Sequence, residues 1–226
     1  MKVFELLVCF ALFYSCFSTR AQGTFQNLNF ENANLSPIPS GQFGSAVSIT
    51  DALPGWNGYL GTNETTGVLQ NNSTLGSASI DILGPNWASG GIIEGQYTVL
   101  LQFGRGLSGI PGDNVYAAIS QVGLVPATAR SILYYSGTPS SSVAPISVLF
   151  ASQQIPVAVV ASTATFTIYG GDVSAFAGQT GALRFEGNGF LDAIQFSAQQ
   201  IPEPGTFGLF GLGGLLLVWR FLCKRS

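Results

Sequence analysis

Short apolar runs, separated by glycine, serine, threonine and asparagine, fill the chain between residues 22 and 200. Several runs alternate with a period of two, as in a β-strand: Phe166 and Ile168 share one face, with threonines on the other. Tyr97–Phe103 is apolar without interruption, which indicates a central strand buried on both sides. The pattern therefore predicts strands, and no amphipathic helix of useful length.

Turn signals recur between these runs about every 8–15 residues, which is typical of an all-β fold, an antiparallel β-sandwich or jelly roll. In the last run Asp192, Ile194 and Phe196 are expected to share one face. One helical turn is predicted at Val173–Phe176, with Asp172 as its cap. The predicted strands are Leu28–Phe30, Ala46–Ile49, Trp56–Leu60, Ser79–Leu83, Tyr97–Phe103, Val115–Ser120, Ser131–Tyr135, Ile146–Phe150, Thr163–Tyr169, Ala182–Phe185 and Leu191–Phe196.

The two ends of the chain depart from this pattern. At the start Lys2 precedes an apolar run from Leu6 to Phe17, and small residues flank a cut expected after Ala21. A positive start, a short apolar core and small residues are typical of a signal peptide, here residues 1–21. The chain divides into this segment, an exported domain at 22–200 and a distinct tail at 201–226.

The tail has three parts. Pro202, Glu203 and Pro204 form a stiff, extended segment, because the two prolines forbid regular helix. An apolar, glycine-rich stretch follows at 206–222, about 25 Å long as a helix and thus sufficient for a thin membrane span. Basic residues at the end would hold it in the cytoplasm by the positive-inside rule; they are Arg220, Lys224 and Arg225.

A Pro-Glu-Pro motif, a glycine- and leucine-rich span and a basic end resemble the PEP-CTERM sorting signal, over Ile201–Ser226. The resemblance implies an exported bacterial protein whose tag is read and cut by an exosortase-like protease. Such a protein is anchored transiently in the inner membrane and then delivered to the cell envelope, cell surface or extracellular matrix. The alternative is a plain tail anchor with a chance pair of prolines.

Composition narrows the role of the exported domain. Residues 22–200 contain no cysteine, histidine or lysine, and three arginines against nine acids give a net charge of −6. Nucleic acid and anionic lipid are poor partners for such a surface. Without cysteine the domain has no disulfides and depends on a packed core. A Ser-His or Cys-His nucleophile is excluded, and a zinc site is not expected.

Two scattered sets of residues resemble galactose-binding-like jelly rolls. One is Asn29-Phe30-Glu31-Asn32 with Pro54-Gly55-Trp56, and the other is Asp172–Thr180 with Leu191-Asp192-Ala193-Ile194. The resemblance implies a jelly-roll fold and, in many members of that group, carbohydrate binding. It transfers no ligand-binding residues to this chain.

Carbohydrate binding needs exposed aromatic rings that stack on sugars, with polar side chains beside them. The candidate contacts are Trp87 in a glycine-rich loop, Tyr59, and Arg105 between two glycines. Arg105 would hydrogen-bond sugar hydroxyls or an acidic polysaccharide, or else pair with a neighbouring acid. Trp56 is expected to close one end of the sandwich instead.

Two further chemistries remain as alternatives. Asp113 with Asn114, or Asp172 with Glu186, would offer oxygen ligands to a structural calcium ion, although turn and capping roles explain the same residues. No other cofactor is expected. A carboxylate pair of the glycosidase type would make the domain a secreted carbohydrate-active enzyme. We favour a non-enzymatic structural or adhesive matrix protein that binds glycan, such as an exopolysaccharide.

Overall fold

The computed structural model describes residues 23–87, 91–106, 112–137 and 146–201. The predicted signal peptide at 1–21 lies outside these residues, as do the Pro202–Pro204 motif and the apolar stretch at 206–222. The basic residues Arg220, Lys224 and Arg225 lie outside them too. Across the described residues, no helix has both the length and the apolar character needed to cross a bilayer.

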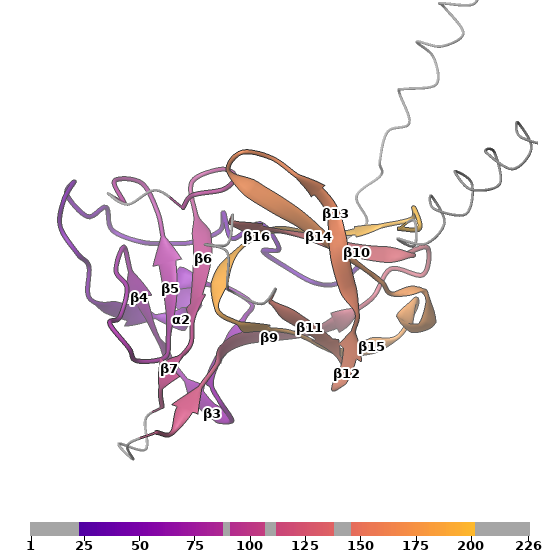
Figure 1. Cartoon of the computed structure of the whole chain (residues 1–226), viewed down its shortest axis with the longest axis horizontal. Helices are drawn as coiled ribbons and strands as arrows, with labels where there is room; N and C mark the ends of the chain where they lie inside the picture. The colour runs from indigo at the N-terminus through magenta and orange to yellow at the C-terminus, as the bar shows by residue number, and fades with distance from the viewer. Residues whose placement is uncertain (1–22, 88–90, 107–111, 138–145, 202–226) are drawn as a thin grey trace, which may run out of the picture.

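Two sheets form most of the structure (Figure 1), and all but one of the strand pairings within them are antiparallel. The eight-stranded sheet has the order β1-β4-β5-β6-β16-β10-β14-β13. Its strands are β1 (Ala46–Ser48), β4 (Gly67–Gln70), β5 (Ser79–Leu83), β6 (Thr98–Gln102), β16 (Gly189–Ser197), β10 (Ser131–Gly137), β14 (Phe166–Asp172) and β13 (Val157–Ser162). The prediction of an all-β fold with antiparallel sheets is confirmed.

The six-stranded sheet has the order β12-β11-β15-β9-β2-β3, and a separate two-stranded ribbon pairs β7 with β8. The strands are β12 (Gln153–Ile155), β11 (Ser147–Phe150), β15 (Thr180–Gly187), β9 (Ala117–Leu124), β2 (Asn57–Leu60), β3 (Asn63–Thr65), β7 (Gly104–Arg105) and β8 (Asn114–Val115). From β9 onward, apart from the β12–β13 excursion, successive strands alternate between the sheets, with β9, β11 and β15 in one and β10, β14 and β16 in the other.

A single apolar core lies between the sheets and receives the inward-facing residues of both. Phe185 of β15 and Tyr134 of β10 meet there edge to face, with ring centroids 5.6 Å apart. Trp56 is 2% exposed, packs against Phe30 and Phe185, and donates its indole N–H to the Asn27 carbonyl at 3.1 Å. Trp56 is thus a core residue, as the sequence predicted.

Several predicted strands have different boundaries, and one does not form. Leu28–Phe30 is a turn with buried side chains, because Asn27 and Phe30 adopt positive φ angles that an extended strand does not allow. The predicted strand at Ala46–Ile49 stops at Ser48, whose side chain caps the short helix α2 (Ile49–Ala52).

The last strand, β16, departs from regular alternation. Ala193 has a φ of 46°, and the pairing of β16 with β10 shifts register near it. Asp192 consequently does not share a face with Ile194 and Phe196, contrary to the prediction. The predicted helical turn forms as the 3-10 helix η1 (Ser174–Phe176), and Asp172 Oδ1 accepts a hydrogen bond from the Ser174 N–H at 2.7 Å.

Candidate functional site

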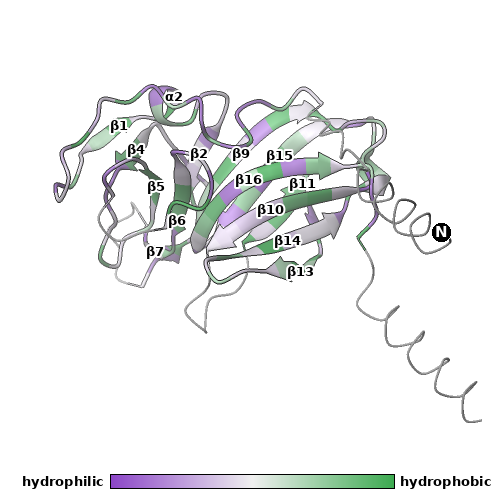
Figure 2. Ribbon diagram, turned by 90° about the horizontal axis from the view of Figure 1, so that it is seen from above, coloured by the Kyte–Doolittle hydropathy of each residue, from purple (hydrophilic) through white to green (hydrophobic). Residues whose placement is uncertain are grey.

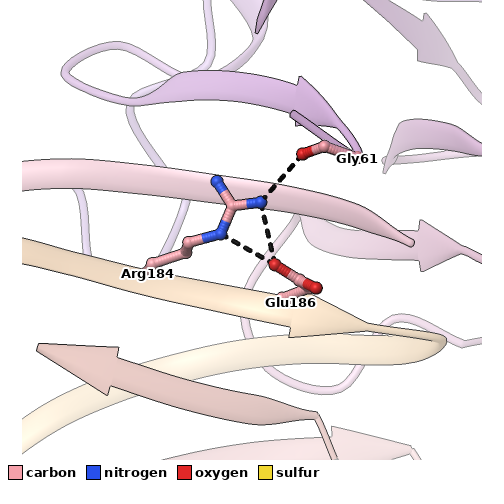
Figure 3. A network of polar contacts seen from close by, with 3 residues as sticks. All are labelled: Gly61, Arg184 and Glu186. Carbon is pink, nitrogen blue, oxygen red and sulfur yellow. Dashed lines mark hydrogen bonds and ion pairs between the residues drawn. The ribbon is translucent and has the colours of Figure 1, made fainter. Parts of the chain in front are cut away.

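Tyr59 lies on the solvent-facing side of the six-stranded sheet, under an arginine. The Arg184 guanidinium stands 4.8 Å from the centroid of the Tyr59 ring, a cation–π distance. Arg184 also binds Glu186 at 2.8 Å and donates to the Gly61 carbonyl at 3.1 Å (Figure 3). The predicted sugar-stacking face of Tyr59 is therefore covered by Arg184, which leaves the Arg184–Glu186 pair as the outer polar group.

Arg105 lies on the β7–β8 ribbon, where it pairs in register with Asn114. Phe103 and Tyr116 flank the ribbon with ring centroids 4.6 Å apart, and they are 41% and 47% exposed. Side chains two apart along a strand point the same way, so Phe103 and Arg105 share one side of the ribbon. We call Phe103, Arg105, Asn114 and Tyr116 the ribbon platform.

The ribbon platform is fixed to both sheets by backbone groups. The Gly61 N–H donates to the Tyr116 carbonyl at 2.9 Å, so the residue that accepts from Arg184 also holds Tyr116. The Phe103 N–H donates to Asn188 Oδ1 at 3.2 Å, in the turn that leads into β16. Tyr59 and Arg105 consequently lie at the same end of the molecule, the end where β3 and β7 appear in Figure 1.

Trp87 lies at the other end. Arg105 forms an isolated β-bridge with Ser77, which lies just before the start of β5. Trp87 instead lies a few residues after the end of β5. The five residues of β5 alone span about 17 Å, so Trp87 and Arg105 do not belong to one site. Trp87 is half-buried and meets the edge of Phe43, which is 71% exposed, with ring centroids 6.1 Å apart.

The sequence reasoning missed three of these aromatic residues: Phe43, Phe103 and Tyr116. The predicted buried strand Tyr97–Phe103 includes Phe103, yet β6 ends one residue before it. The glycines on both sides of Arg105 were the only local sign that the chain leaves the sheet there.

Two carboxylic acids are fully buried in the eight-stranded sheet. Burial raises the pKa of Asp81 to about 7, and the hydrogen bond from Ser79 opposes that rise only in part. Burial raises the pKa of Asp192 to about 6, against hydrogen bonds from Thr98 and from the Glu94 and Ala193 amides. Asp81 is on β5 and Asp192 on β16, with β6 between them, so their backbones lie about 10 Å apart or more.

Asp192 is occupied in holding a loop. It accepts hydrogen bonds from Thr98 Oγ1 at 2.6 Å and from the Glu94 N–H at 3.1 Å. Glu31 accepts from the next amides along the loop, those of Gln96 and Tyr97. Together the two carboxylates fix the segment that leads into β6.

The fold separates one of the two candidate calcium pairs, Asp172 with Glu186. Asp172 ends β14 in the eight-stranded sheet and binds the Ser174 amide, whereas Glu186 is in the six-stranded sheet with Arg184. Asn114 has its side chain exposed on the ribbon, next to Asp113. Within the described ranges no three Asp, Glu, His or Cys residues come together as ligands for a metal ion.

Comparison with known proteins identifies the tail. The family described as PEP-CTERM protein-sorting motif matches residues 200–225. Comparison with curated proteins and with solved structures gives no match. The matched segment starts where the described structure ends, since β16 stops at Ser197 and Ile201 is the last described residue. The chain therefore carries the PEP-CTERM sorting motif directly after its β-sandwich, which indicates an exported protein that is processed by an exosortase-type protein at the cell envelope.

Proposed function

We propose that this protein is anchored transiently in the inner membrane by residues 206–222, released by an exosortase-like protease, and delivered to the cell surface or extracellular matrix. The observation that carries the proposal is the PEP-CTERM motif at residues 200–225. The apolar length of the tail and its basic end support the anchoring step.

The second part of the proposal concerns the fold type, a jelly roll. Its support is the strand order. If β6, β9, β10, β11, β12, β14, β15 and β16 are numbered 1 to 8, one sheet contains the order 1-8-3-6 and the other 2-7-4-5. That alternation is the order of a jelly roll, in which two Greek keys are wrapped into two sheets. The strands β1 to β5 and β13 then extend the two sheets at their edges.

The third part is a non-enzymatic, adhesive role in which the ribbon platform binds glycan. Two exposed aromatic rings offer apolar faces for a sugar, while Arg105 and Asn114 beside them offer hydrogen-bond donors. No ion pair joins Arg105 to another described residue, so its charge is available to a carboxylate of an acidic polysaccharide. The exported domain as a whole is acidic, with a net charge of −6, so Arg105 is a positive group on a mainly negative domain.

The positions of Asp81, Asp192 and Glu186 support a non-catalytic role better than a glycosidase activity. A glycosidase needs two carboxyl groups that flank one bond of a substrate. Asp81 and Asp192 are both inaccessible to solvent and lie on strands separated by β6, and Asp192 is occupied by the loop that begins at Glu94. Glu186, which is partly exposed, is paired with Arg184.

Two experiments test these parts separately. In a host strain without its exosortase, the full-length chain should accumulate in the inner membrane, and restoring the protease should release a shortened form. Release that continues without the protease would refute the sorting proposal.

The adhesive role is tested by affinity electrophoresis of the full chain, in detergent, through gels that contain alginate as a model acidic polysaccharide. Retardation should be lost in Arg105→Ala and Tyr116→Ala and kept in Trp87→Ala, a matched aromatic control at the other end. Equal mobility with and without alginate, or loss in the control alone, would refute the glycan site.

A further inference from the structure

The outer faces of the two sheets differ in character. On the six-stranded sheet the solvent-facing positions include Asn57, Ser120, Arg184 and Glu186. On the eight-stranded sheet, most outward positions of β10, β14 and β13 are apolar, with the exposed Asp172 at the end of β14, and β13 forms the edge beside β14 (Figure 2). This apolar face consists of Leu133, Tyr135, Val160, Phe166, Ile168 and Ile201.

The face is partly open to solvent: Val160 is exposed, and the other residues of the face are half-buried. Val160, on the edge strand, is 44% exposed, and its side chain lies on the outward side of Gly170. Tyr135 and Phe166 stack with ring centroids 4.8 Å apart and remain half-exposed. A contiguous apolar surface of this kind on an exported domain marks an interaction site.

The chain itself crosses this face just before the sorting motif. Ile201 lies over Gly170, where a Cβ would overlap Ile201 Cδ1, Leu133 Cδ2 and Val160 Cγ2. The preceding turn is held by Ser131, whose hydroxyl donates to the Gln199 carbonyl at 2.7 Å. The side chain of Ile201 therefore occupies a depression that only glycine leaves open, and its neighbour Val160 belongs to the exposed edge.

Chain length then limits where the motif can go. Pro202 follows Ile201 directly, and Pro204 is three residues from it, so the whole motif stays within about 11 Å of the apolar face. A protein that encloses Pro202–Pro204 cannot do so without touching the sandwich. The surface it meets first is the one on which Ile201 sits.

We propose that the apolar face is the docking surface for the exosortase-like protease that reads the motif. The proposal rests on the proposed function, because it requires that such a protease acts on this chain. A lipid surface fits less well, because a domain with a net charge of −6 is repelled by anionic headgroups. The protease gains affinity from the folded domain as well as from the short motif, and it distinguishes a folded substrate from an unfolded one.

The test compares two exposed valines on opposite faces in the full chain, expressed in the native host with its exosortase. Val160→Glu places a charge in the apolar face, while Val122→Glu places the same charge on β9, where Val122 is 68% exposed. Pulse-chase labelling measures the rate at which the tail is removed. Val160→Glu should slow removal about tenfold, the loss expected for one central interface contact, and Val122→Glu should leave it unchanged.

A second measurement separates docking from folding. A photo-crosslinking residue at position 160 should give an adduct with an epitope-tagged exosortase, and the same residue at position 122 should give none. Equal removal rates for the two glutamate variants would overturn the docking surface, and so would an adduct with a second copy of the chain alone. If Glu203→Ala is also cut at the wild-type rate, the proposed function itself fails; if it is not cut while Val160→Glu is, only the docking surface fails.

Discussion

The buried Asp81 should make the stability of the protein depend on pH. Its side chain is completely buried in β5, where Ser79 Oγ donates to Oδ2 at 2.7 Å. Its Oδ1 atom has no hydrogen-bond partner among the described residues. Burial raises the pKa of Asp81 from 3.8 to about 7, so the folded state holds a proton that the unfolded chain releases.

The difference between the folded and unfolded pKa values of Asp81 determines how the free energy of unfolding changes with pH. Between pH 4 and 7 the folded state binds more protons than the unfolded state, so the free energy of unfolding falls as the pH rises through this window. A pKa of about 7 against 3.8 corresponds to about 4 kcal/mol of stability, present below pH 4 and lost above pH 7. Asp192, with a pKa of about 6, adds a loss of the same sign. Asp172 does not contribute here, because the Ser174 amide lowers its pKa below 3.8.

The perturbation is Asp81→Asn, measured by urea unfolding of the full chain in detergent between pH 5 and pH 8, followed by tryptophan fluorescence. The wild type should lose stability toward pH 8, and the variant should lose much less. At pH 8 the variant should be the more stable by about 1–3 kcal/mol, because an unpaired amide costs less than a buried charge. Asp51→Asn, in the exposed first turn of α2, is the matched control and should keep the wild-type slope. If Asp81→Asn keeps the full pH dependence of the wild type, or if the wild type is more stable at pH 8 than at pH 5, the buried Asp81 does not set the pH dependence of stability.

Three further substitutions test individual contacts in the core, on the six-stranded sheet and under Ile201. Tyr134→Phe should cost about 1–3 kcal/mol in urea unfolding, since it leaves the buried Ile146 carbonyl without the hydroxyl that donates to it at 2.8 Å. Arg184→Gln should cost less than about 1 kcal/mol, because the Arg184–Glu186 pair is partly exposed, and a loss above 2 kcal/mol would show that the pair is more deeply coupled. Gly170→Ala should cost about 1–3 kcal/mol and make the bond after Ile201 more accessible to added protease, since the new methyl group displaces that side chain; unchanged proteolysis would show that Ile201 is not seated there.

The sequence predicts the central strands well, because their patterns are long and undisturbed. The predicted Ser79–Leu83 is β5 residue for residue, and Tyr97–Phe103 and Ile146–Phe150 differ from β6 and β11 only at their ends. The strands β3, β4, β7, β12 and β13 lie outside the predicted ranges, and the predicted strand at Leu28–Phe30 does not form. Two of these differences have a clear physical reason. The edge strand β13 is a short apolar run without alternation, and the turn at Leu28–Phe30 depends on positive φ angles at residues other than glycine.

It is harder to predict which face of a strand meets the core than to predict which residues share a face. Phe166 and Ile168 alternate with threonines as expected, but it is Thr167 that is buried and the apolar pair that faces outward. A period of two assigns residues to faces without saying which face meets the core. The same limit applies to the candidate site: the glycines near Tyr59 and on both sides of Arg105 predict exposed loops, whereas the exposure of Phe103 and Tyr116 follows from how the ribbon leaves the sheet.

The claim that most needs a direct measurement is that the tail is a processing signal rather than a permanent anchor. Intact mass and cell fractionation of the full chain in its native host, with and without Glu203→Ala, test it. The wild type should lose its C-terminal segment and leave the inner membrane, while the variant should stay there at nearly full length. If both forms stay in the membrane with the tail intact, the tail is only an anchor and the account is contradicted.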